Sequence, residues 1–425
     1  MICTLEIYIK DQWIKAANFE VRPQTEIDKG YRGSGFLTYD EDYTAEHLNE
    51  RGINAISCRY LVNYQLYDGE AWPSFLLDLL PSGAGRRHWL SKLAIQDGPK
   101  SDWTLLLKGA GNAPGNLRIA EAVLPLPPTP HAGFEYADII TRQEKFIEYA
   151  QTHGAPVAGS TGAQGDAPKF LLSEDHHGHW HADGALADSL TARHWLVKFP
   201  RGKEASDRRI LRNEAAYAKV AKTMGLRVFG DFKFDNNVLF VPRFDREVTR
   251  NQVIRHGQET LCSLAGVSEF SVRIPQERLC EVIAEYSSNK EADIKEFVLR
   301  DVLNVAMGNT DNHARNTSMS KYPDGRVTLS PLYDFAPMIL DDQGIARVCR
   351  WTDVEDSGMP DWGRVADKLG PLGIDSKKLR AELRTFGAKV RALPQIMTQQ
   401  GVDPDLIKQL KMHVKELADK LEKTC

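Results

Sequence analysis

The stretch Met307-Gly-Asn-Thr-Asp-Asn-His-Ala-Arg-Asn316 decides the fold of this chain. It follows an apolar helical pattern over residues 296–307, and Gly308 is the residue type that most often ends a helix. After the glycine, a polar loop carries Asp311 and, five positions later, Asn316. One interpretation is that these polar residues are ordinary turn formers after a helix end. The other is that the loop carries catalytic and metal-binding residues.

A second acidic residue, Asp334, follows the loop after a predicted hairpin whose turn is Asp324-Gly325. Phosphoryl transfer uses such a set of groups. One carboxylate takes or orients the proton of the attacking hydroxyl, while an amide oxygen and a second carboxylate hold the metal ions that bridge the phosphates. We therefore expect Asp311 to be the base, and Asn316 and Asp334 to be metal ligands.

The spacing strengthens this interpretation. In the protein-kinase catalytic loop, H-R-D-x-x-x-x-N, the Asn also stands five positions after the catalytic Asp, and a metal-binding Asp-Phe-Gly follows. Two departures are visible: Asn309-Thr310 replaces His-Arg, and Ala336 follows Phe335 where a kinase has Gly.

Composition excludes several classes of protein. With 425 residues, of which 42% are apolar, the chain can bury more than one core. The net charge of −4 shows no excess of the basic residues that bind nucleic acid, so we expect DNA contact only through a partner. The six cysteines fall in no metal-ligand spacing, and the sequence contains neither a signal peptide nor a membrane-spanning apolar run. We expect a cytoplasmic protein without membrane contact.

The N-terminal part mixes strands and short helices. Leu5, Ile7 and Ile9 alternate with polar residues and predict a half-buried strand. Residues 75–81 predict a short buried helix that Pro and Gly stop. The glycine-rich residues 109–115 could cradle a phosphate, but without a following Lys-Ser/Thr pair a structural turn is the better interpretation.

After a proline-rich spacer at 124–130 and a helical pattern at 137–152, residues 154–169 form a small, polar, glycine-containing loop. Its amides could wrap phosphate oxygens, or it could be a mobile surface loop. Lys198 ends a β-like run downstream, where a kinase places the lysine that contacts nucleotide phosphates. A solvent-facing strand lysine is the alternative.

Three further patterns lie around Lys198. The four histidines in residues 176–181 suggest a metal, although a polar hairpin tip is simpler. Asn213-Glu214 is predicted to open a helix, in which Glu214 could orient a basic partner or favour the helix dipole. The buried strand 238–242 leads to a position typical of a hinge, where the backbone of residues 242–244 could meet an adenine ring. Near the C-terminus, residues 376–391 and 403–422 predict two helices.

In this order, the motifs resemble the HipA-like Ser/Thr kinases, the toxins of type II toxin–antitoxin systems. The resemblance spans nearly the whole chain. It rests on residues 75–83, Ala113-Pro-Gly-Asn-Leu117, Gly162-Ala-Gln164, Pro168-Lys-Phe170, Val197-Lys198, Asn213-Glu214, Arg243-Phe-Asp-Arg246, the stretch 308–316, and Leu332-Tyr-Asp334.

The resemblance implies an α+β, two-lobed protein-kinase-like fold with an N-terminal β-rich subdomain and an all-helical C-lobe. The expected domains are 1–124, similar to the HipA N-terminal subdomain; 134–248, the small-lobe core with nucleotide loop and hinge; and 249–425, the helical C-lobe with the catalytic loop.

ATP and Mg²⁺ are the implied cofactors, with Asp311 as catalytic base and Asn316 and Asp334 as metal ligands. The residues implied to bind the nucleotide are Gly162, Ala163, Gln164, Lys198, Pro242, Arg243, Phe244, His313, Asn316 and Asp334. Family members also autophosphorylate a serine before Gly-Ala-Gln. Here Gly159 occupies that position, and Ser160 and Thr161 beside it are the candidate sites.

The implied activity is that of an ATP- and Mg²⁺-dependent serine/threonine protein kinase. As a toxin it would act on a cytoplasmic translation component such as an aminoacyl-tRNA synthetase, and a small helix-turn-helix antitoxin similar to HipB would neutralise it. Two alternatives stay open. The altered loop around Ser160 suggests a catalytically inert nucleotide-binding regulator or co-repressor scaffold. A small-molecule phosphotransferase is the other, because no motif encodes the acceptor.

Overall fold

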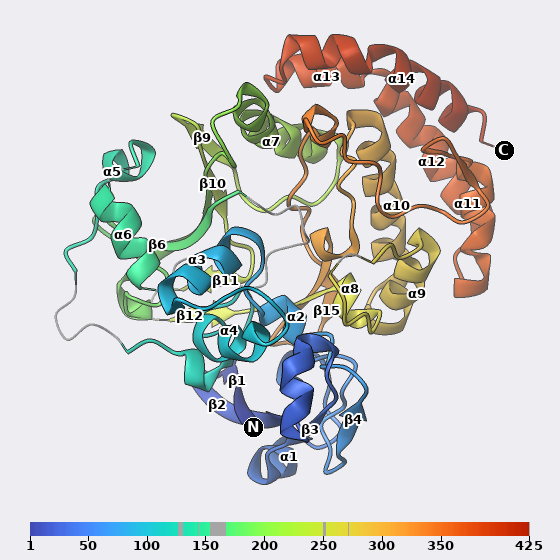
Figure 1. Cartoon of the computed structure of the whole chain (residues 1–425). Helices are drawn as coiled ribbons and strands as arrows, with labels where there is room; N and C mark the ends of the chain where they lie inside the picture. The colour runs from blue at the N-terminus through green and yellow to red at the C-terminus, as the bar shows by residue number, and fades with distance from the viewer. Residues whose placement is uncertain (126–130, 143, 154–166, 250–251, 271, 425) are drawn as a thin grey trace. The chain divides into compact units, whose positions relative to one another are not determined.

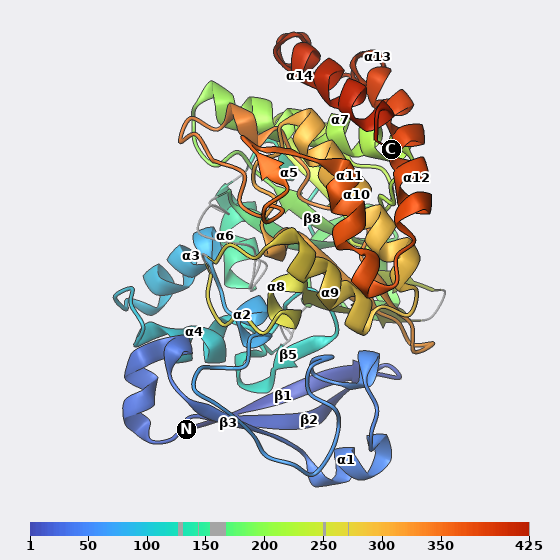
Figure 2. The ribbon, with the colours of Figure 1, turned by 90° about the vertical axis from the view of Figure 1, so that its right-hand side faces the viewer.

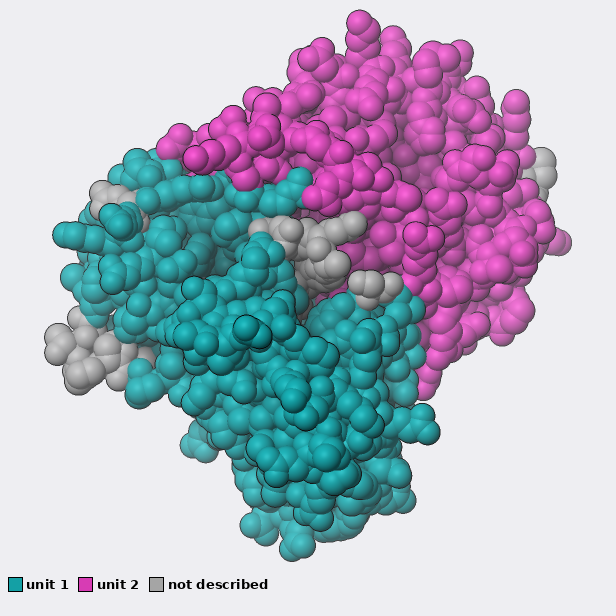
Figure 3. All heavy atoms as spheres, viewed as in Figure 1, with its two compact units in different colours: residues 1–201, 240–272, 320–327 teal, residues 202–239, 273–319, 328–425 magenta. Residues whose placement is uncertain are grey.

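The computed structural model describes residues 1–125, 131–142, 144–153, 167–249, 252–270 and 272–424. The chain divides into two compact units, which Figure 3 distinguishes by colour. The first comprises residues 1–201, 240–272 and 320–327, and the second comprises 202–239, 273–319 and 328–425. The three domains expected from the sequence stay a prediction. No helix within the described ranges is both long and apolar enough to cross a membrane.

The first unit begins with an antiparallel sheet of order β4-β3-β2-β1-β5, whose strands β1, β2 and β3 lie side by side in Figure 2. The strands are β1 (Ile2–Ile9), β2 (Gln12–Glu20), β3 (Gly35–Tyr39), β4 (Tyr67–Gly69) and β5 (Leu117–Ile119). Lys10 and Asp11 have φ of 48° and 65°, which suits a two-residue hairpin turn. Leu5 and Ile7 are buried, which confirms the predicted strand.

The same unit also contains helices. They are α1 (Glu41–His47), α2 (Leu76–Leu79), α3 (Gly83–Leu93), α4 (Ser101–Gly109), α5 (Tyr136–Ile140) and α6 (Glu144–Thr152). The predicted short helix at 75–81 is confirmed as α2, whose leucines pack with Trp72 and Trp103. The single helix expected at 137–152 is wrong. Arg142 adopts φ of 54°, a left-handed conformation that a continuous helix cannot contain.

A second sheet follows (Figure 1), in which β6 (Lys169–Asp175) pairs antiparallel with β7 (Trp180–Ala182) and β8 (Thr191–Lys198). Next to β8 lies β10 (Val238–Pro242), as the buried apolar run predicted. The unit also contains β11 (Arg246–Val248), β12 (Val253–Arg255), β13 (Gly257–Thr260) and α8 (Leu261–Leu264).

The second unit is mostly helical. Its helices are α7 (Ala205–Met224), α9 (Gln276–Tyr286), α10 (Lys290–Met307), α11 (Trp362–Lys368), α12 (Ser376–Arg391), α13 (Leu393–Gln399) and α14 (Pro404–Glu422). The two predicted C-terminal helices are confirmed as α12 and α14. The apolar stripe of α14 is buried, and this helix contacts α10, α12 and α13.

Two expectations about this region need correction. The part expected to be an all-helical C-lobe, residues 249–425, also contains short strands. These are β12, β13, β14 (Ser318–Lys321), β15 (Val327–Leu329), β16 (Glu355–Asp356) and β17 (Met359–Pro360). Strand β9 (Lys233–Asp235) precedes this part of the chain. Helix α7 begins at Ala205, not at Asn213, because its first turns are charged and carry no apolar periodicity that marks a helix start. Asn213-Glu214 therefore lies inside the helix.

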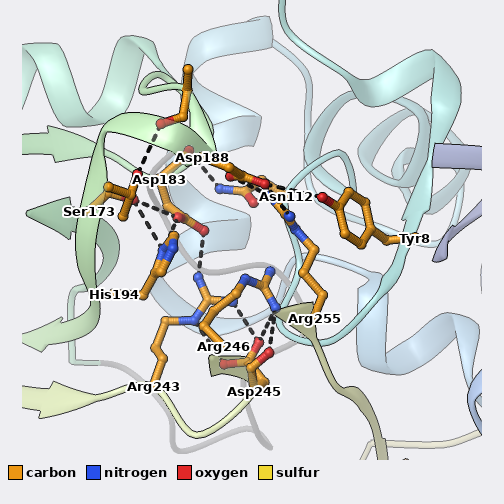
Figure 4. Close-up of polar contacts among 12 residues, drawn as sticks. Tyr8, Asn112, Ser173, Asp183, Asp188, His194, Arg243, Asp245, Arg246 and Arg255 are labelled. Atoms are coloured by element: carbon orange, nitrogen blue, oxygen red, sulfur yellow. Dashed lines mark hydrogen bonds and ion pairs between the residues drawn. The ribbon is translucent and has the colours of Figure 1, made fainter. Parts of the chain in front are cut away.

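A buried ion cluster fixes the first unit, with Asp245 between the guanidinium groups of Arg243 and Arg246 (Figure 4). Asp245 also accepts from the Gly115 amide at 2.7 Å, and Arg246 donates to the Gly115 carbonyl at 2.8 Å. The glycine-rich loop is therefore a structural turn, as expected. Burial would raise the pKa of Asp245, but the two guanidinium groups hold that pKa well below its usual range.

Asp188 takes part in a second set of contacts, which joins β1 to β12. Arg255 donates to both of its carboxylate oxygens, at 2.6 and 3.0 Å, and lies over the ring of Tyr8 at 4.1 Å from the centroid. Because Tyr8 is in β1 and Arg255 is in β12, these contacts join the N-terminal sheet to a hairpin far along the chain (Figure 4).

We predict that Asp245→Ala lowers the free energy of unfolding by about 3–5 kcal/mol, because it leaves two buried guanidinium groups without their carboxylate. Urea titration followed by circular dichroism measures this change. The matched control is Asp231→Ala, whose exposed ion pair with Lys222 should contribute less than about 1 kcal/mol. Equal effects of the two substitutions would show that the cluster does not stabilise the unit.

Candidate active site

The residues predicted to act on a phosphoryl group lie in both units. The second unit brings together Asp311, His313, Asn316 and Asp334, of which the last three line one small pocket of about 20 Å³. Such a volume holds about one water-sized particle.

Helix α10 determines where the loop starts. Gly308 ends the helix with φ of 68°, and its neighbour Asn309 donates its amide proton to the Asn304 carbonyl at 2.9 Å. A Cβ atom at Gly308 would lie 2.9 Å from a methyl carbon of Ile339, closer than real contacts allow. The predicted glycine helix end is confirmed, and both the dihedral and the space require glycine there.

The loop from Asp311 to Asn316 closes on itself. The Asn316 side-chain amide donates to the Asp311 backbone carbonyl at 2.9 Å, and the Asn316 backbone amide donates to the His313 carbonyl at 2.9 Å. His313 Nε2 lies 3.6 Å from Asp311 Oδ1. The five-residue spacing thus has a structural meaning, because it lets the asparagine fix the backbone of the aspartate.

Asp334 is held in an unusual conformation. Its φ is 53°, in the left-handed region, which few non-glycine residues adopt and which aspartate enters more readily than most. On its N-terminal side, Leu332 donates its amide proton to the Arg227 carbonyl at 2.7 Å, and the Tyr333 hydroxyl donates to the Arg315 carbonyl at 3.0 Å. These anchors determine where the Asp334 carboxylate lies.

The donor set fits Mg²⁺. The side-chain amide nitrogen of Asn316 is used within the loop, and its Oδ1 is buried with no hydrogen-bond donor among the described residues. A buried acceptor without a partner is costly and often marks an ion or ligand position. An amide oxygen and a carboxylate, from Asn316 and Asp334 in the same pocket, are the hard oxygen ligands that Mg²⁺ binds.

The sequence interpretation missed Tyr217. It appeared as one apolar position of a helix, but its hydroxyl donates to the Met307 carbonyl at 2.7 Å, and its ring contacts Phe335 at 5.3 Å between centroids. Tyr217 therefore joins α7 to the last residue of α10 and to the neighbour of Asp334. The sequence feature that could have indicated this role is a tyrosine among the aliphatic residues of a buried helix face, because a buried hydroxyl group needs a hydrogen-bond partner.

Helix α7 carries the buried Glu214, and the residue before it, Asn213, anchors the helix. The Asn213 side chain accepts the Asp403 amide proton at 2.9 Å, and Asp403 in turn accepts from Arg209 and Arg212 at 3.0 and 3.1 Å. The turn before α14 thereby fixes the position of this helix.

In the first unit, Lys198 is the last residue of β8, where its side chain is buried and opposite Lys169. A solvent-facing lysine, the alternative from the sequence, is excluded by this burial. The nucleotide role of Lys198 stays a prediction.

Of the predicted hinge residues, Pro242 is the last residue of β10, and Arg243 and Phe244 follow it directly. The Arg243 side chain is occupied by Asp183 and Asp245, and its amide donates to the His194 carbonyl at 3.1 Å (Figure 4). These contacts occupy the guanidinium of Arg243. The predicted contact of the backbone of Pro242, Arg243 and Phe244 with an adenine ring stays a prediction.

The histidine-rich hairpin between β6 and β7 is organised by Asp175. This carboxylate accepts the amide protons of His177 and His179 at 2.8 and 2.9 Å, which with other hydrogen bonds lowers its pKa to about 2 although burial opposes the shift. Within the described ranges, no group of three or more His, Cys, Asp or Glu side chains could hold a metal ion. Gly162, Ala163, Gln164, Ser160 and Thr161 lie outside the described residues.

Comparisons with known proteins agree with this architecture. The family model of the HipA-like C-terminal domain matches residues 161–393, and that of the HipA N-terminal domain matches residues 28–120. No curated protein matches the sequence.

Among solved structures, a chain of the Shewanella oneidensis MR-1 toxin–antitoxin complex of HipA, HipB and operator DNA superposes with a TM-score of 0.70. The identity is 19%, over 99% of this chain and 97% of that chain. The Helicobacter pylori proinflammatory kinase CtkA gives a TM-score of 0.36 at 11% identity, over 62% of this chain and 93% of that chain. The predicted HipA-like, kinase-like α+β fold class is confirmed. Because the C-terminal family model covers more than half of its length, the chain belongs to the HipA-like family.

Proposed function

We propose that this protein is an ATP- and Mg²⁺-dependent serine/threonine protein kinase. The observation that carries the proposal is the second-unit loop, where Asn316 holds the backbone of Asp311 while its own oxygen stays without a described donor. Asp334, constrained at φ of 53°, lines the same pocket as Asn316. A base and two metal-binding oxygens are the groups that phosphoryl transfer requires.

Each residue then has a defined task. Asp311 accepts the proton of the attacking hydroxyl, and Asn316 keeps its backbone in place. The Asn316 Oδ1 and the Asp334 carboxylate hold Mg²⁺, which neutralises phosphate charge when bound. Lys198 contacts the phosphates, and the backbone of Pro242, Arg243 and Phe244 faces the adenine ring.

Family membership supports the other proposed nucleotide contacts. Gly162, Ala163 and Gln164 would bind the nucleotide. His313, whose Nε2 lies 3.6 Å from Asp311 Oδ1, would contact it beside the base. The acceptor is a protein of the translation apparatus, such as an aminoacyl-tRNA synthetase, which makes the chain a cytoplasmic toxin. A small HipB-like antitoxin restrains it and provides the contact with DNA. Support for this partner comes from the similar HipA complex, which contains HipB and operator DNA.

We predict that Asp311→Asn reduces phosphate transfer from radiolabelled ATP by at least about 100-fold, because the amide cannot take the hydroxyl proton. Incubation with Mg²⁺, with and without cell lysate, followed by gel electrophoresis measures the labelled protein. Asp324→Asn, the same change at the exposed tip of the β14–β15 hairpin, is the matched control and should keep full activity. An unlabelled wild type that still binds nucleotide would favour the inert scaffold, and label in a small molecule would favour the small-molecule phosphotransferase.

For the metal, we predict that Asp334→Asn raises the Mg²⁺ concentration for half-maximal transfer by at least about tenfold, because it removes an anionic ligand. Removal of divalent ions with EDTA should abolish labelling of the wild type. Asp342→Asn, at an exposed carboxylate that accepts from Ser206, should not change the Mg²⁺ requirement. Labelling that persists in EDTA would exclude a metal role for this pocket.

The loop before Gly162 provides another test. After incubation with ATP, we expect mass spectrometry to find phosphate on Ser160 or Thr161 of the wild type and on neither residue of Asp311→Asn. Replacing both residues by alanine should remove this phosphopeptide and leave phosphorylation of the protein acceptor intact. Phosphate found only at other positions would contradict autophosphorylation in this loop.

A further inference from the structure

Residues 347–351, here named the strap, follow Asp334 and precede α11 in the sequence. Hydrogen bonds fix them to helices of the second unit. Arg347 donates to Asp301 Oδ2 at 2.6 Å, and the Trp351 indole donates to the same oxygen at 2.9 Å. Asp301 is in α10, the helix that leads into the loop of Asp311, and is almost fully buried.

Further hydrogen bonds complete this anchorage. Gln276, the first residue of α9, donates its amide proton to the Arg350 carbonyl at 2.9 Å and its side-chain amide to Asp301 Oδ1 at 2.9 Å. Glu355 accepts from Arg347 and from the Trp351 amide, both at 3.1 Å. Burial would lower the pKa of Arg347, but Asp301 and Glu355 raise it, so the guanidinium stays charged. The strap is therefore a rigid segment.

One side chain connects the strap to the loop. Asn312 donates from Nδ2 to the Cys349 carbonyl at 2.8 Å, while its Oδ1 accepts the amide protons of Val348 and Cys349 at 3.0 and 3.1 Å. The Val348 amide also lies 3.3 Å from the Thr310 carbonyl. Both sequence neighbours of Asp311 are thus bonded to the strap.

These contacts distinguish Asn312 from an ordinary turn former. A turn asparagine bonds to its own backbone within two or three residues, whereas Asn312 bonds residues 36 and 37 positions away. Only a primary amide offers a donor and an acceptor in the geometry of a backbone peptide group. On the other side of the base, the Asn316 side chain holds the Asp311 carbonyl at 2.9 Å.

We propose that Asn312 is a positioning residue that transfers the rigidity of the strap to Asp311, and so sets the reach of the base toward the acceptor hydroxyl. This inference rests on the proposed kinase function. A displacement of about 1 Å can reduce the rate of a reaction about 100-fold without loss of binding. The nucleotide ligands Asn316 and Asp334 are not held by Asn312, so its loss should affect kcat and leave KM for ATP unchanged.

The test compares the full-length wild type, Asn312→Ala and a control, Asn289→Ala. Asn289 is exposed and accepts the Ala292 amide proton at the start of α10, so its replacement also removes an Asn-to-backbone hydrogen bond. We expect Asn312→Ala to lower kcat by about 10- to 100-fold with KM for ATP within about twofold of the wild type. Asn289→Ala should leave both constants unchanged.

Amide hydrogen exchange gives a readout that is independent of activity. The amide of Cys349 donates to Asn312, so it should exchange at least about tenfold faster in Asn312→Ala and at the wild-type rate in Asn289→Ala. The Val348 amide keeps the Thr310 carbonyl as a second acceptor, so a smaller change is expected there. If the wild type transfers no phosphate, the proposed function fails while this measurement still tests the link between loop and strap. Unchanged exchange would overturn the link itself.

Two kinetic results would overturn the positioning role: a kcat of Asn312→Ala equal to that of the wild type, or a KM for ATP that rises as much as kcat falls. If Asn312→Ala does not fold, Asn312→Asp replaces it. Its carboxylate keeps an acceptor for both strap amides, but an acceptor oxygen takes the place of the group that donates to the Cys349 carbonyl. We expect kcat of Asn312→Asp to fall at least about threefold with KM for ATP unchanged, and an unchanged kcat would again contradict the proposal.

Discussion

The left-handed turn at Gly308 is the constraint on which the chemistry of the second unit depends. Helix α10 is a rigid, buried element, and its end determines where the following loop begins. Only glycine adopts φ of 68° without strain and without a collision with Ile339. Once the turn is made, Asn309 bonds back to Asn304, and the loop carries Asp311 at a defined distance from the helix. The backbone geometry thus fixes where the loop of the candidate base begins, and the side chains of Asn312 and Asn316 then hold the loop in place.

Buried carboxylates provide the second level of order. In the first unit Asp245 joins two arginines to the Gly115 turn, and in the second unit Asp301 joins Arg347 and Trp351 to α10. Both carboxylates hold segments that are distant in the sequence. Such clusters favour one packing of the segments over others, because a buried charge must be paired and few alternative partners can pair with it. The Asn312 link then connects one of these fixed segments to the loop of Asp311.

Part of the fold and of the candidate site could be predicted from the sequence. The strand at Leu5, helices α12 and α14, and the glycine end of α10 follow from local periodicity and from backbone preference. The Asp311–Asn316 spacing and the position of Asp334 after a hairpin also follow. Other features could not be predicted. The start of α7 has no apolar pattern, and Arg142 interrupts a helical pattern through its backbone conformation alone. From the sequence, Tyr217 is one more apolar residue on the buried face of a helix. Only the structure shows the carbonyl that accepts its hydroxyl proton.

The sequence by itself determined which residue types are available and how far apart they stand: the Asp-x₄-Asn spacing, the glycines at helix ends, and the acidic composition. These are local properties, carried by neighbours within a few positions. The tertiary structure alone decided that Asn312 reaches Val348 and Cys349, that Arg243 binds Asp183 and Asp245, and that Tyr217 touches Phe335. Such contacts depend on how distant segments pack, and a hydrogen bond forms only when donor and acceptor come within about 3 Å in the right orientation. Spacing along the chain does not encode that distance.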